Sequence, residues 1–320
     1  MRLFHHAKYP FLEWRRRAYV ISGLLLALGI GAMVFNVFDI GSWLNYGVDF
    51  RGGTLVQVHF TQPTTVEQVR KLNGGWEIQR LGAASANDFV IRMPSFNENA
   101  GSDTNTQVRD LLAQRFPANT FQISRVEAVG PKVGNELQQK ALYAILASFV
   151  LTLVYLAFRF EWRFGVAAIG ATMHDIIITL GFLALLRSEI STGTVAAFLT
   201  IVGYSLNDTI IVFDRIRENL AKHGRGVPFI ELLDRSINET LPRTVLTAGT
   251  TLATLTALYL FGGVVIRDFC QVLILGIGIG TFSSIFVASP LLYYVEGRWP
   301  PKTKGKKGAA VPSRAQSAAV

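Results

Sequence analysis

Six long apolar segments dominate this sequence. They lie at residues 18–38, 140–158, 164–186, 193–213, 244–262 and 269–294, in a chain that is 50% hydrophobic and 17% charged. A helix of about 20 apolar residues spans the hydrocarbon core of a bilayer, because each residue adds about 1.5 Å. Among short single segments, only helices satisfy their own backbone hydrogen bonds in lipid. The sequence therefore predicts an α-helical polytopic membrane protein with six transmembrane helices.

Basic residues beside these segments predict the orientation of the chain. Cytoplasmic loops of membrane proteins carry an excess of lysine and arginine. Here the excess precedes the first segment and fills the second-to-third loop, the fourth-to-fifth connection and the tail: Arg15, Arg16, Arg17, Arg159, Arg163, Arg215, Arg217, Lys222, Arg225, Arg235, Arg243, Lys302, Lys304, Lys306 and Lys307. The other two short loops carry one basic residue each. We therefore expect both termini in the cytoplasm.

This orientation divides the chain into five parts. They are a cytoplasmic N-terminus (1–17), a first membrane helix (18–38), an external domain (39–138), five further helices (139–294) and a disordered basic cytoplasmic tail (295–320). Residues 214–242, between the fourth and fifth helices, are basic and partly amphipathic. An interfacial helix lying against lipid headgroups accounts for that pattern. A docking surface for a partner protein is the alternative.

Strand and helix patterns alternate in the external domain. Alternating apolar and polar residues predict strands at 54–61, 76–81, 88–93 and 120–129. Helices are expected from the capping residues Thr64 or Thr65 to about Asn73, and at 104–116. The order β-α-β-β-α-β predicts a small α+β domain of the split βαβ type.

Composition argues against several functions. The net charge of +9 sits mostly beside the membrane segments, where it orients the chain and meets anionic membrane lipid, so it does not indicate nucleic-acid binding. No glycine-rich phosphate loop of the Walker type is present, so no nucleotide cofactor is expected. The histidines outside the membrane are isolated, and no metal site is predicted. Gly276 and Gly280 lie in a membrane segment at the spacing that allows close helix packing.

An aspartate inside the fourth apolar segment is the main candidate functional residue. A charged carboxylate in the middle of a membrane helix costs roughly 2.5–3.5 kcal/mol on insertion scales, so such residues are retained for ion or proton coupling. Asp208 shares one helix face with four small or polar residues, at the spacing i, i+3, i+4, i+7 and i+8. That face consists of Thr200, Gly203, Tyr204, Asn207 and Asp208. A polar face of this kind contacts protein or water, not lipid.

The fifth segment carries a second polar stripe, which begins with an arginine. Its members are Arg243, Thr247, Thr250, Thr251 and Thr254. Asp208 is expected five residues before the end of its helix and Arg243 at the start of the next, so their depths match. Burial penalises a charged carboxylate and a nearby arginine stabilises it, so a protonation change could move a helix. Alternatively, the two residues only hold two helices together, or Arg243 only anchors the helix end.

His174 and Asp175 are adjacent in the middle of the third segment. An imidazole beside a carboxylate can relay protons. The same pair can equally cap a buried polar cluster, and neighbouring helix residues point about 100° apart. The sequence leaves both roles open.

Seven motifs are spread along nearly the whole chain. They are GVDFRGGT at 47–54, VGPKVGNEL at 129–137, FRFEWRFG at 158–165, MHDIIITLG at 173–181, GYSLNDTIIVFDRIREN at 203–219, TLPRTVLT at 240–247 and GTFSSIFVASPLL at 280–292. Together, and in this order, they resemble SecF, the smaller subunit of the bacterial SecD–SecF accessory complex of protein export.

The resemblance implies a subunit of the resistance–nodulation–division superfamily in the bacterial inner membrane. Such a subunit pairs with SecD as the other pseudo-symmetric half and works beside the SecYEG channel. It is not an enzyme: it uses the proton motive force to help draw a translocating polypeptide outward. The family's coupling carboxylate and arginine correspond to Asp208 and Arg243, with His174, Asp175, Asn207 and Thr247 as further candidates. The alternatives are a small-molecule or lipid exporter of the same superfamily and a passive scaffold of the translocon.

Overall fold

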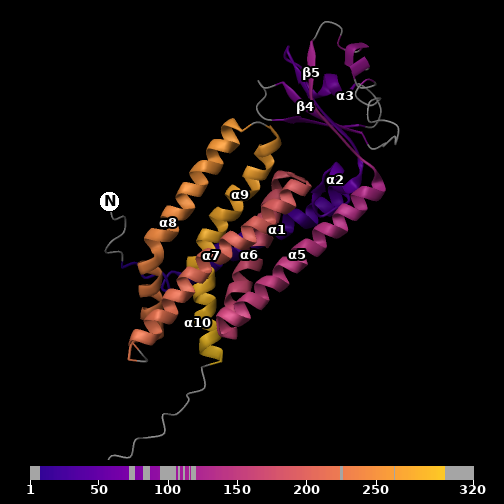
Figure 1. The fold of residues 1–320 in the computed structure, drawn as a ribbon. Coiled ribbons are helices and arrows are strands. Elements are labelled where there is room, and N and C mark those ends of the chain that lie inside the picture. Colours follow the sequence, from indigo (N-terminus) through magenta and orange to yellow (C-terminus); the bar gives the residue numbers. More distant parts are fainter. Residues whose placement is uncertain are drawn as a thin grey trace, which may run out of the picture.

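The structure is a computed structural model that describes residues 8–71, 76–81, 87–93, 106, 109–110, 112–114, 116, 120–223, 226–262 and 264–299. A bundle of long helices carries a small α+β domain at one end (Figure 1). The opposite end of the bundle is called the distal end below. Of the predicted disordered tail, 295–320, residues 295–298 are helical, and residues from 300 onward lie outside the described part of the chain.

Within the described residues, six helical spans are long and apolar enough to cross a membrane, which confirms a multi-pass membrane protein. The first five are α1 (Arg15–Ile40), α5 (Pro131–Arg159), α6 (Trp162–Leu186), α7 (Thr192–His223) and α8 (Phe229–Phe261). The sixth joins α9 (Val264–Ser283), the π-helical turn η2 (Ser284–Ala288) and α10 (Ser289–Arg298). Pro290 follows this turn and lacks a backbone N–H, and the Ser289 hydroxyl donates to the Ser284 carbonyl five residues earlier (3.3 Å).

Helices α7 and α8 extend well past the apolar segments, which corrects two expectations. Asp208 does not lie near the end of its helix, because α7 continues to His223. Arg243 does not begin a helix either: α8 starts at Phe229 and runs through Pro242. Residues 214–223 and 229–242 are therefore no separate interfacial helix but the ends of α7 and α8 that extend past the apolar segments. A straight helix of 32 residues is about 48 Å long, more than the hydrocarbon core of about 30 Å.

Polar contacts join these ends of α7 and α8 at the distal end. Glu239 of α8 accepts hydrogen bonds from Arg215 (2.6 Å) and Asn219 (2.8 Å) of α7 and from Arg235 of its own helix (3.1 Å). The N-terminal segment also binds there, since the Tyr9 N–H donates to Asn238 and the Leu12 N–H donates to Asp234. These contacts fix the distal end of α8 to its neighbours.

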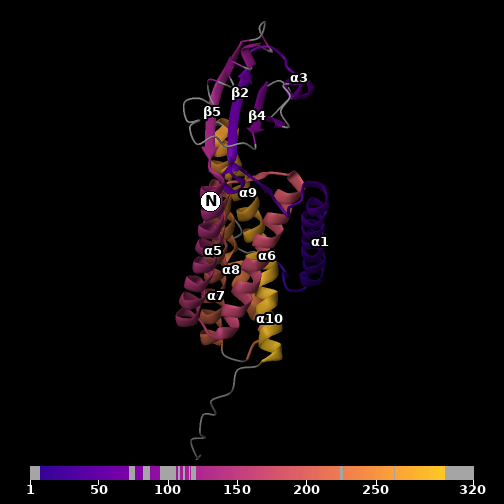
Figure 2. The ribbon, with the colours of Figure 1, turned by 90° about the vertical axis from the view of Figure 1, so that its right-hand side faces the viewer.

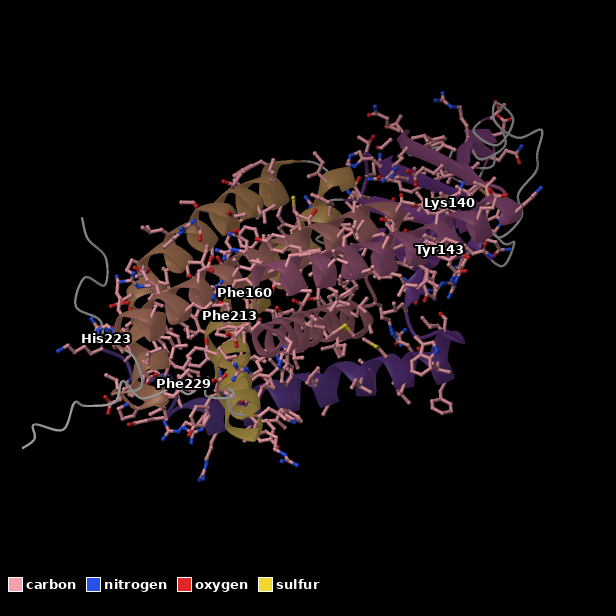
Figure 3. The ribbon with its side chains drawn as sticks, turned by 60° about the horizontal axis from the view of Figure 1, so that its bottom comes forward. Lys140, Tyr143, Phe160, Phe213, His223 and Phe229 are labelled. Carbon is pink, nitrogen blue, oxygen red and sulfur yellow. The ribbon has the colours of Figure 1, made fainter. Side chains whose placement is uncertain are left out.

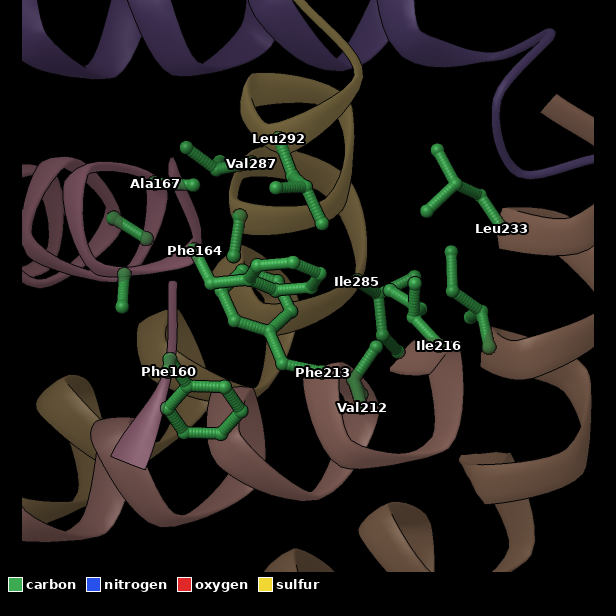
Figure 4. Packing of buried hydrophobic residues seen from close by; sticks show 14 of the residues in the cluster. Phe160, Phe164, Ala167, Val212, Phe213, Ile216, Leu233, Ile285, Val287 and Leu292 are labelled. Atoms are coloured by element: carbon green, nitrogen blue, oxygen red, sulfur yellow. The ribbon is translucent and has the colours of Figure 1, made fainter. Parts of the chain in front are cut away.

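An apolar cluster fills the distal half of the bundle (Figure 4). Phe160, Phe164 and Phe213 pack edge to face or stacked, with ring centroids 5.3–6.3 Å apart. Val212 and Ile216 of α7, Leu233 of α8 and Ile285 of η2 complete the contact. Side chains on the apolar face of residues 229–237 are therefore buried against protein. Packing against protein, not headgroups, explains the amphipathic pattern of this segment.

The α+β domain has the predicted split βαβ topology (Figure 2). Its sheet has the order β3-β4-β2-β5, with every neighbouring pair antiparallel. The strands are β2 (Gly53–Phe60), β3 (Glu77–Leu81), β4 (Asp88–Met93) and β5 (Phe121–Val129). Thr65 caps α3 (Val66–Arg70) in a capping box with Gln68, so of the two predicted caps the second is used. Residues 106, 109–110 and 112–114, within the second predicted helix, are helical.

Short elements connect this domain to the membrane helices. Strand β1 (Asn45–Tyr46) pairs in parallel with β6 (Glu189–Ile190), which lies between α6 and α7. A single helical turn, α2 (Val48–Arg51), then leads directly into β2. At its other end the sheet continues from β5 into α5 through Gly130. Both chain connections of the domain therefore reach the bundle through short, structured links.

Helix α1 contacts α6 through two glycines. A Cβ atom added at Gly29 would lie 2.9 Å from the Gly181 Cα, closer than carbon atoms approach. Asn36 strengthens this contact by donating to the Ala184 carbonyl (3.0 Å). Without side chains at this crossing, α1 and α6 approach backbone to backbone.

We expect Gly29→Val to push α1 away from α6 and to destabilise the protein by about 1–3 kcal/mol, the usual cost of overpacking. Gly31→Val is the matched control, because a Cβ there meets nothing within 4 Å. The measurement is the unfolding midpoint of each purified variant in the same detergent. Equal midpoints for the two variants would contradict the proposed close contact.

Candidate functional site

The polar cluster around Asp175 joins three helices inside the bundle. The Asp175 side chain is fully buried (0% exposed) on α6. One of its carboxylate oxygens accepts hydrogen bonds from the Ser205 hydroxyl of α7 (2.6 Å) and from the Ser283 hydroxyl of α9 (2.7 Å). Its other oxygen lies 2.9 Å from the Nδ1 atom of His174. A buried carboxylate with this many donors is a fixed connection between helices.

Small residues allow α9 to approach α7 closely enough for this cluster to form. A Cβ atom at Gly276 would overlap the Ile201 side chain, and one at Gly280 would lie 3.1 Å from the Ser205 Cβ. The packing role predicted for these glycines is therefore confirmed. One turn further along α9, Ser283 reaches Asp175. The glycines position the serine donor.

His174 contacts its neighbour Asp175 directly, although adjacent helix residues point in different directions. The imidazole is 8% exposed, and its Nε2 atom has no hydrogen-bond partner within the described residues. Two threonines on α6 near Asp175 do not donate to its carboxylate. Thr172 donates to the Ala168 carbonyl and Thr179 to the Asp175 carbonyl, both within α6.

Asp208 is buried in α7 without a hydrogen-bond partner. It is 1% exposed, and neither carboxylate oxygen has a partner among the described parts of the chain. Buried polar groups in native proteins are nearly always paired, and an unpaired buried charge costs several kcal/mol. Asp175 accepts hydrogen bonds from two serines, whereas Asp208 accepts none from the described residues. That is the arrangement expected of a group that exchanges a proton or an ion.

Arg243 does not form an ion pair with Asp208. The guanidinium is exposed on α8, and Asp208 has no hydrogen-bond partner in the described residues. Arg243 nevertheless lies near enough to act electrostatically on the Asp208 carboxylate. The alternative role, in which the two residues pair to hold α7 and α8 together, has no such hydrogen bond in the described residues.

The two predicted polar stripes lie together on an exposed face of the bundle. Tyr204 of α7 donates to the Thr251 hydroxyl of α8 (3.2 Å) and joins the stripes. Asn207 and Thr247 are both exposed, and the Thr247 hydroxyl donates to the Arg243 carbonyl (2.9 Å). The exposed members are Thr200, Gly203, Asn207, Arg243, Thr247, Thr250 and Thr254. We call these residues the exposed polar face.

Helix α5 shows how a lipid-type surface differs from this face. Its outer residues are large and apolar, among them Leu146, Leu151 and Phe158, and all are exposed. Tyr143 and Lys140, labelled in Figure 3, lie near the end of α5 next to the α+β domain. The small and polar side chains of the exposed polar face cannot make the apolar contacts with lipid chains that the outer residues of α5 can make. This face requires protein or water.

Sequence reasoning found the central carboxylates but missed their surroundings. Ser205 and Ser283 were not predicted, because hydroxyl residues are common in membrane helices and carry no distinctive spacing. Asp49, in the GVDFRGGT motif, was also missed: its carboxylate accepts hydrogen bonds from Thr192 at the start of α7. A buried carboxylate in a membrane helix was the available signal, since it implies that donors exist somewhere in the fold.

Comparison with known proteins identifies the family. The family described as "Protein export membrane protein SecD/SecF, C-terminal" matches residues 107–298, and the "SecD/SecF GG Motif" matches residues 40–64. A protein translocase subunit SecF from Gemmatimonas aurantiaca is 47% identical over 310 residues, covering 94% of this chain and 91% of that protein. The SecF subunit of Vibrio alginolyticus is 41% identical over 308 residues, covering 93% and 94%.

Solved structures of SecDF agree with this result. The crystal structure of SecDF, a translocon-associated membrane protein from Thermus thermophilus, matches with a TM-score of 0.81 and 38% identity. SecDF in its super-membrane-facing form matches with a TM-score of 0.64. The chain covers 40% of the length of the first of these proteins and 39% of the second. With motifs, fold and relatives in agreement, this chain belongs to the SecF family of protein-export membrane proteins.

Proposed function

We propose that this chain is one half of a SecD–SecF-type unit that uses an ion gradient to promote the outward movement of polypeptides across the cytoplasmic membrane. The observation that carries the proposal is Asp208, a buried carboxylate without a hydrogen-bond partner in the described residues, beside an exposed polar face. The first feature provides a group that can take up and release an ion. The second provides the surface where another protein completes the site.

A SecD-type subunit is the proposed occupant of the exposed polar face. The SecDF relative carries both halves in one chain, and this chain covers 40% of it. Pairing would cover Thr200, Asn207 and Thr247 with protein and would enclose Asp208 and Arg243 in a shared site. Polar and small residues are typical of helix interfaces inside membranes.

In the proposed cycle, Asp208 receives a proton from the external side and releases it toward the cytoplasm. Neutralising the carboxylate removes its attraction to Arg243, so the packing of α7 against α8 changes. Asn207 and Thr247 flank this path, and their oxygen atoms also suit Na⁺. One charge moving through 100 mV supplies about 2.3 kcal/mol, which is enough to bias a helix motion. The work is mechanical and involves no enzymatic step.

The proposed orientation places the α+β domain outside and both termini in the cytoplasm. Arginines and lysines are concentrated at the distal end, which supports this assignment. The basic distal surface would meet anionic lipid, and the translocon-associated relative supports a position beside the SecYEG channel. His174 and Asp175 are proposed to hold α6, α7 and α9 in register, so the cluster supports the coupling helix without carrying the ion.

The alternative of a small-molecule exporter requires a pocket in the external domain. A cavity of about 1170 Å³ does exist, but it opens at the distal end between α6, α7, α8 and α10. Its lining includes Arg163, Phe229 and Tyr293, and no residue of the α+β domain. A passive scaffold, the second alternative, would have no use for an unpaired carboxylate inside the membrane, because that residue lowers stability.

The proposed function is tested by export into membrane vesicles that contain the translocon and the SecD-type subunit. Adding this chain should increase transport of a signal-bearing precursor when an ion gradient is present. Collapsing the proton gradient and the sodium gradient separately identifies the ion. A scaffold would raise export equally with and without a gradient, and either that result or gradient-driven efflux of small molecules would contradict the proposal.

A further inference from the structure

The GVDFRGGT motif has a position in the structure that the proposed ion cycle does not use. It forms the turn α2 and the first residues of β2, so it stands between the membrane bundle and the α+β domain. Gly52 and Gly53 have φ angles of +74° and +117°, which glycine adopts without strain. The sheet begins immediately after α2, with no flexible linker. A displacement of α2 is therefore passed directly to β2.

Asp49, in the middle of this motif, binds the first residue of α7. Its Oδ2 atom accepts hydrogen bonds from the Thr192 backbone N–H and from the Thr192 hydroxyl, both at 2.8 Å. The first N–H groups of a helix have no partners within the helix, and the helix dipole favours a negative charge there. Asp49 satisfies one of these groups from a separate element, 143 residues away in sequence. The contact joins α2 to the helix that carries Asp208.

Two packing contacts make α2 a rigid link. Phe50 is buried in an apolar cluster with Ala197, Phe198 and Ile201 of α7. On its other side, α2 lies against Gly134 of α5, where a Cβ atom would stand only 3.0 Å from the Phe50 carbonyl oxygen. The turn is thus held between α7 and the helix that leaves the α+β domain. Its position follows the position of both.

We propose that Asp49 is the positioning residue through which movement of α7 is transmitted to the α+β domain. The proposal rests on the proposed function, because it assigns the path by which protonation of Asp208 reaches the external domain. Without the Asp49–Thr192 contact, α7 still responds to the ion, but only the apolar packing of Phe50 then joins α2 to α7, and α2 follows the start of α7 less closely. Ion transport then continues while less of the movement reaches the α+β domain.

A second contact between the domain and the bundle provides a competing path. Arg92 of β4 forms an ion pair with Glu189 of β6, the short strand before α7. This pair joins the sheet to the connection between α6 and α7, whereas Asp49 binds α7 itself. The two paths can be separated by substitution, and Arg92→Ala tests the second of them.

The experiment uses the complete complex in vesicles and measures two quantities in parallel. Asp49→Ala should lower gradient-driven export by about tenfold, within the 5- to 150-fold range of typical coupling between sites. Ion uptake by the same vesicles should change by less than about twofold, which is below that range. Gradient-driven export with Asp49→Asn, which keeps an acceptor oxygen, should lie between that of the wild type and that of Asp49→Ala. The matched control is Asp39→Ala. It breaks an ion pair with Arg187 at the same end of the bundle, but that pair joins α1 to the end of α6 and does not involve α2.

Several outcomes would overturn the inference. Normal export with Asp49→Ala would do so, as would an equal loss of ion uptake and export, because the residue would then only support the bundle. Loss of export with Arg92→Ala and not with Asp49→Ala would assign transmission to the other contact. Asp208→Asn is run beside these variants: if it leaves gradient-driven export intact, the proposed function fails. If Asp208→Asn stops export and Asp49→Ala does not, only this inference fails.

Cross-linking separates a mechanical link from a folding defect. The described residues include one cysteine, the buried Cys270, so Asp49→Cys with Thr192→Cys can be studied in a Cys270→Ala background. The paired variant should export poorly before treatment, like Asp49→Ala. A short bifunctional thiol reagent that joins the two positions should restore gradient-driven export. Failure of an efficient cross-link to restore export would contradict a role in transmission.

Discussion

Asp208→Asn should remove the gradient-dependent part of polypeptide export and leave unchanged the export that occurs without a gradient. Asparagine has nearly the same shape as aspartate but cannot bind or release a proton. The site has no donor in the described residues that pairs with Asp208, so the substitution removes charge without breaking a structural hydrogen bond. The loss corresponds to about 2.3 kcal/mol of driving energy for each charge and 100 mV. Export is measured in energised vesicles at equal protein abundance.

The matched control for this result is Asp214→Asn on the same helix. Asp214 is half-exposed near the distal end of α7 and forms ion pairs with Arg159 and Arg217. Surface pairs of this kind contribute about 0–1 kcal/mol, so export should remain near the wild-type level. Asp208→Glu, which keeps an ionisable group, should retain part of the gradient response. If Asp208→Asn exports normally in both conditions, Asp208 is structural and the motor hypothesis is wrong.

Asp175→Ala should destabilise the protein by about 2–4 kcal/mol. The change leaves the Ser205 and Ser283 hydroxyls and one nitrogen of His174 without their acceptor inside the bundle. Orphaned buried groups cost about 1–3 kcal/mol each in soluble proteins, and hydrogen bonds between membrane helices average about 0.6 kcal/mol. Three losses of about 0.6–1.3 kcal/mol each, from the membrane average to the low end of the soluble-protein range, give the expected 2–4 kcal/mol. Thermal unfolding of the purified complex in one detergent provides the measurement.

The controls for Asp175 also decide between a structural cluster and a proton relay. Asp175→Asn keeps an acceptor oxygen for the serines and should cost less stability than Asp175→Ala. Ser205→Ala and Ser283→Ala should each have a small effect, because each removes one hydrogen bond. A structural cluster predicts that export follows stability across this series. If Asp175→Asn is stable and yet loses gradient-driven export, His174 and Asp175 carry the proton and the structural assignment is wrong.

The sequence predicted the membrane helices well because their signal is local. Each apolar segment contains within itself the residues that make it insert and the backbone groups that satisfy one another. The same holds for the strands of the α+β domain, whose alternation specifies which face is buried. Helix ends were predicted less well. Residues 214–223 and 229–242 are polar enough to resemble a loop, and contacts such as Arg215 with Glu239 extend the helices there.

For the candidate site, too, the sequence predicts what is local and not what depends on distant residues. From the sequence alone, Asp208 and Asp175 stand out, because a carboxylate in an apolar segment is costly wherever the chain folds. Their different surroundings depend on residues far away in the chain. Asp175 obtains donors from positions 30 and 108 residues further on, whereas Asp208 obtains none from the described residues. No spacing rule within one helix can distinguish these two cases.

The sequence by itself determined the membrane class, the number of spans, the topology of the small domain and the two carboxylates. Tertiary structure alone decided that Asp175 has hydrogen-bond donors, that Asp208 has none in the described residues, and that Asp49 binds the start of α7. The physical reason is how far apart in the sequence the interacting residues lie. Hydrophobic insertion and strand alternation depend on neighbours in the sequence, whereas a hydrogen bond between helices depends on how the whole bundle packs.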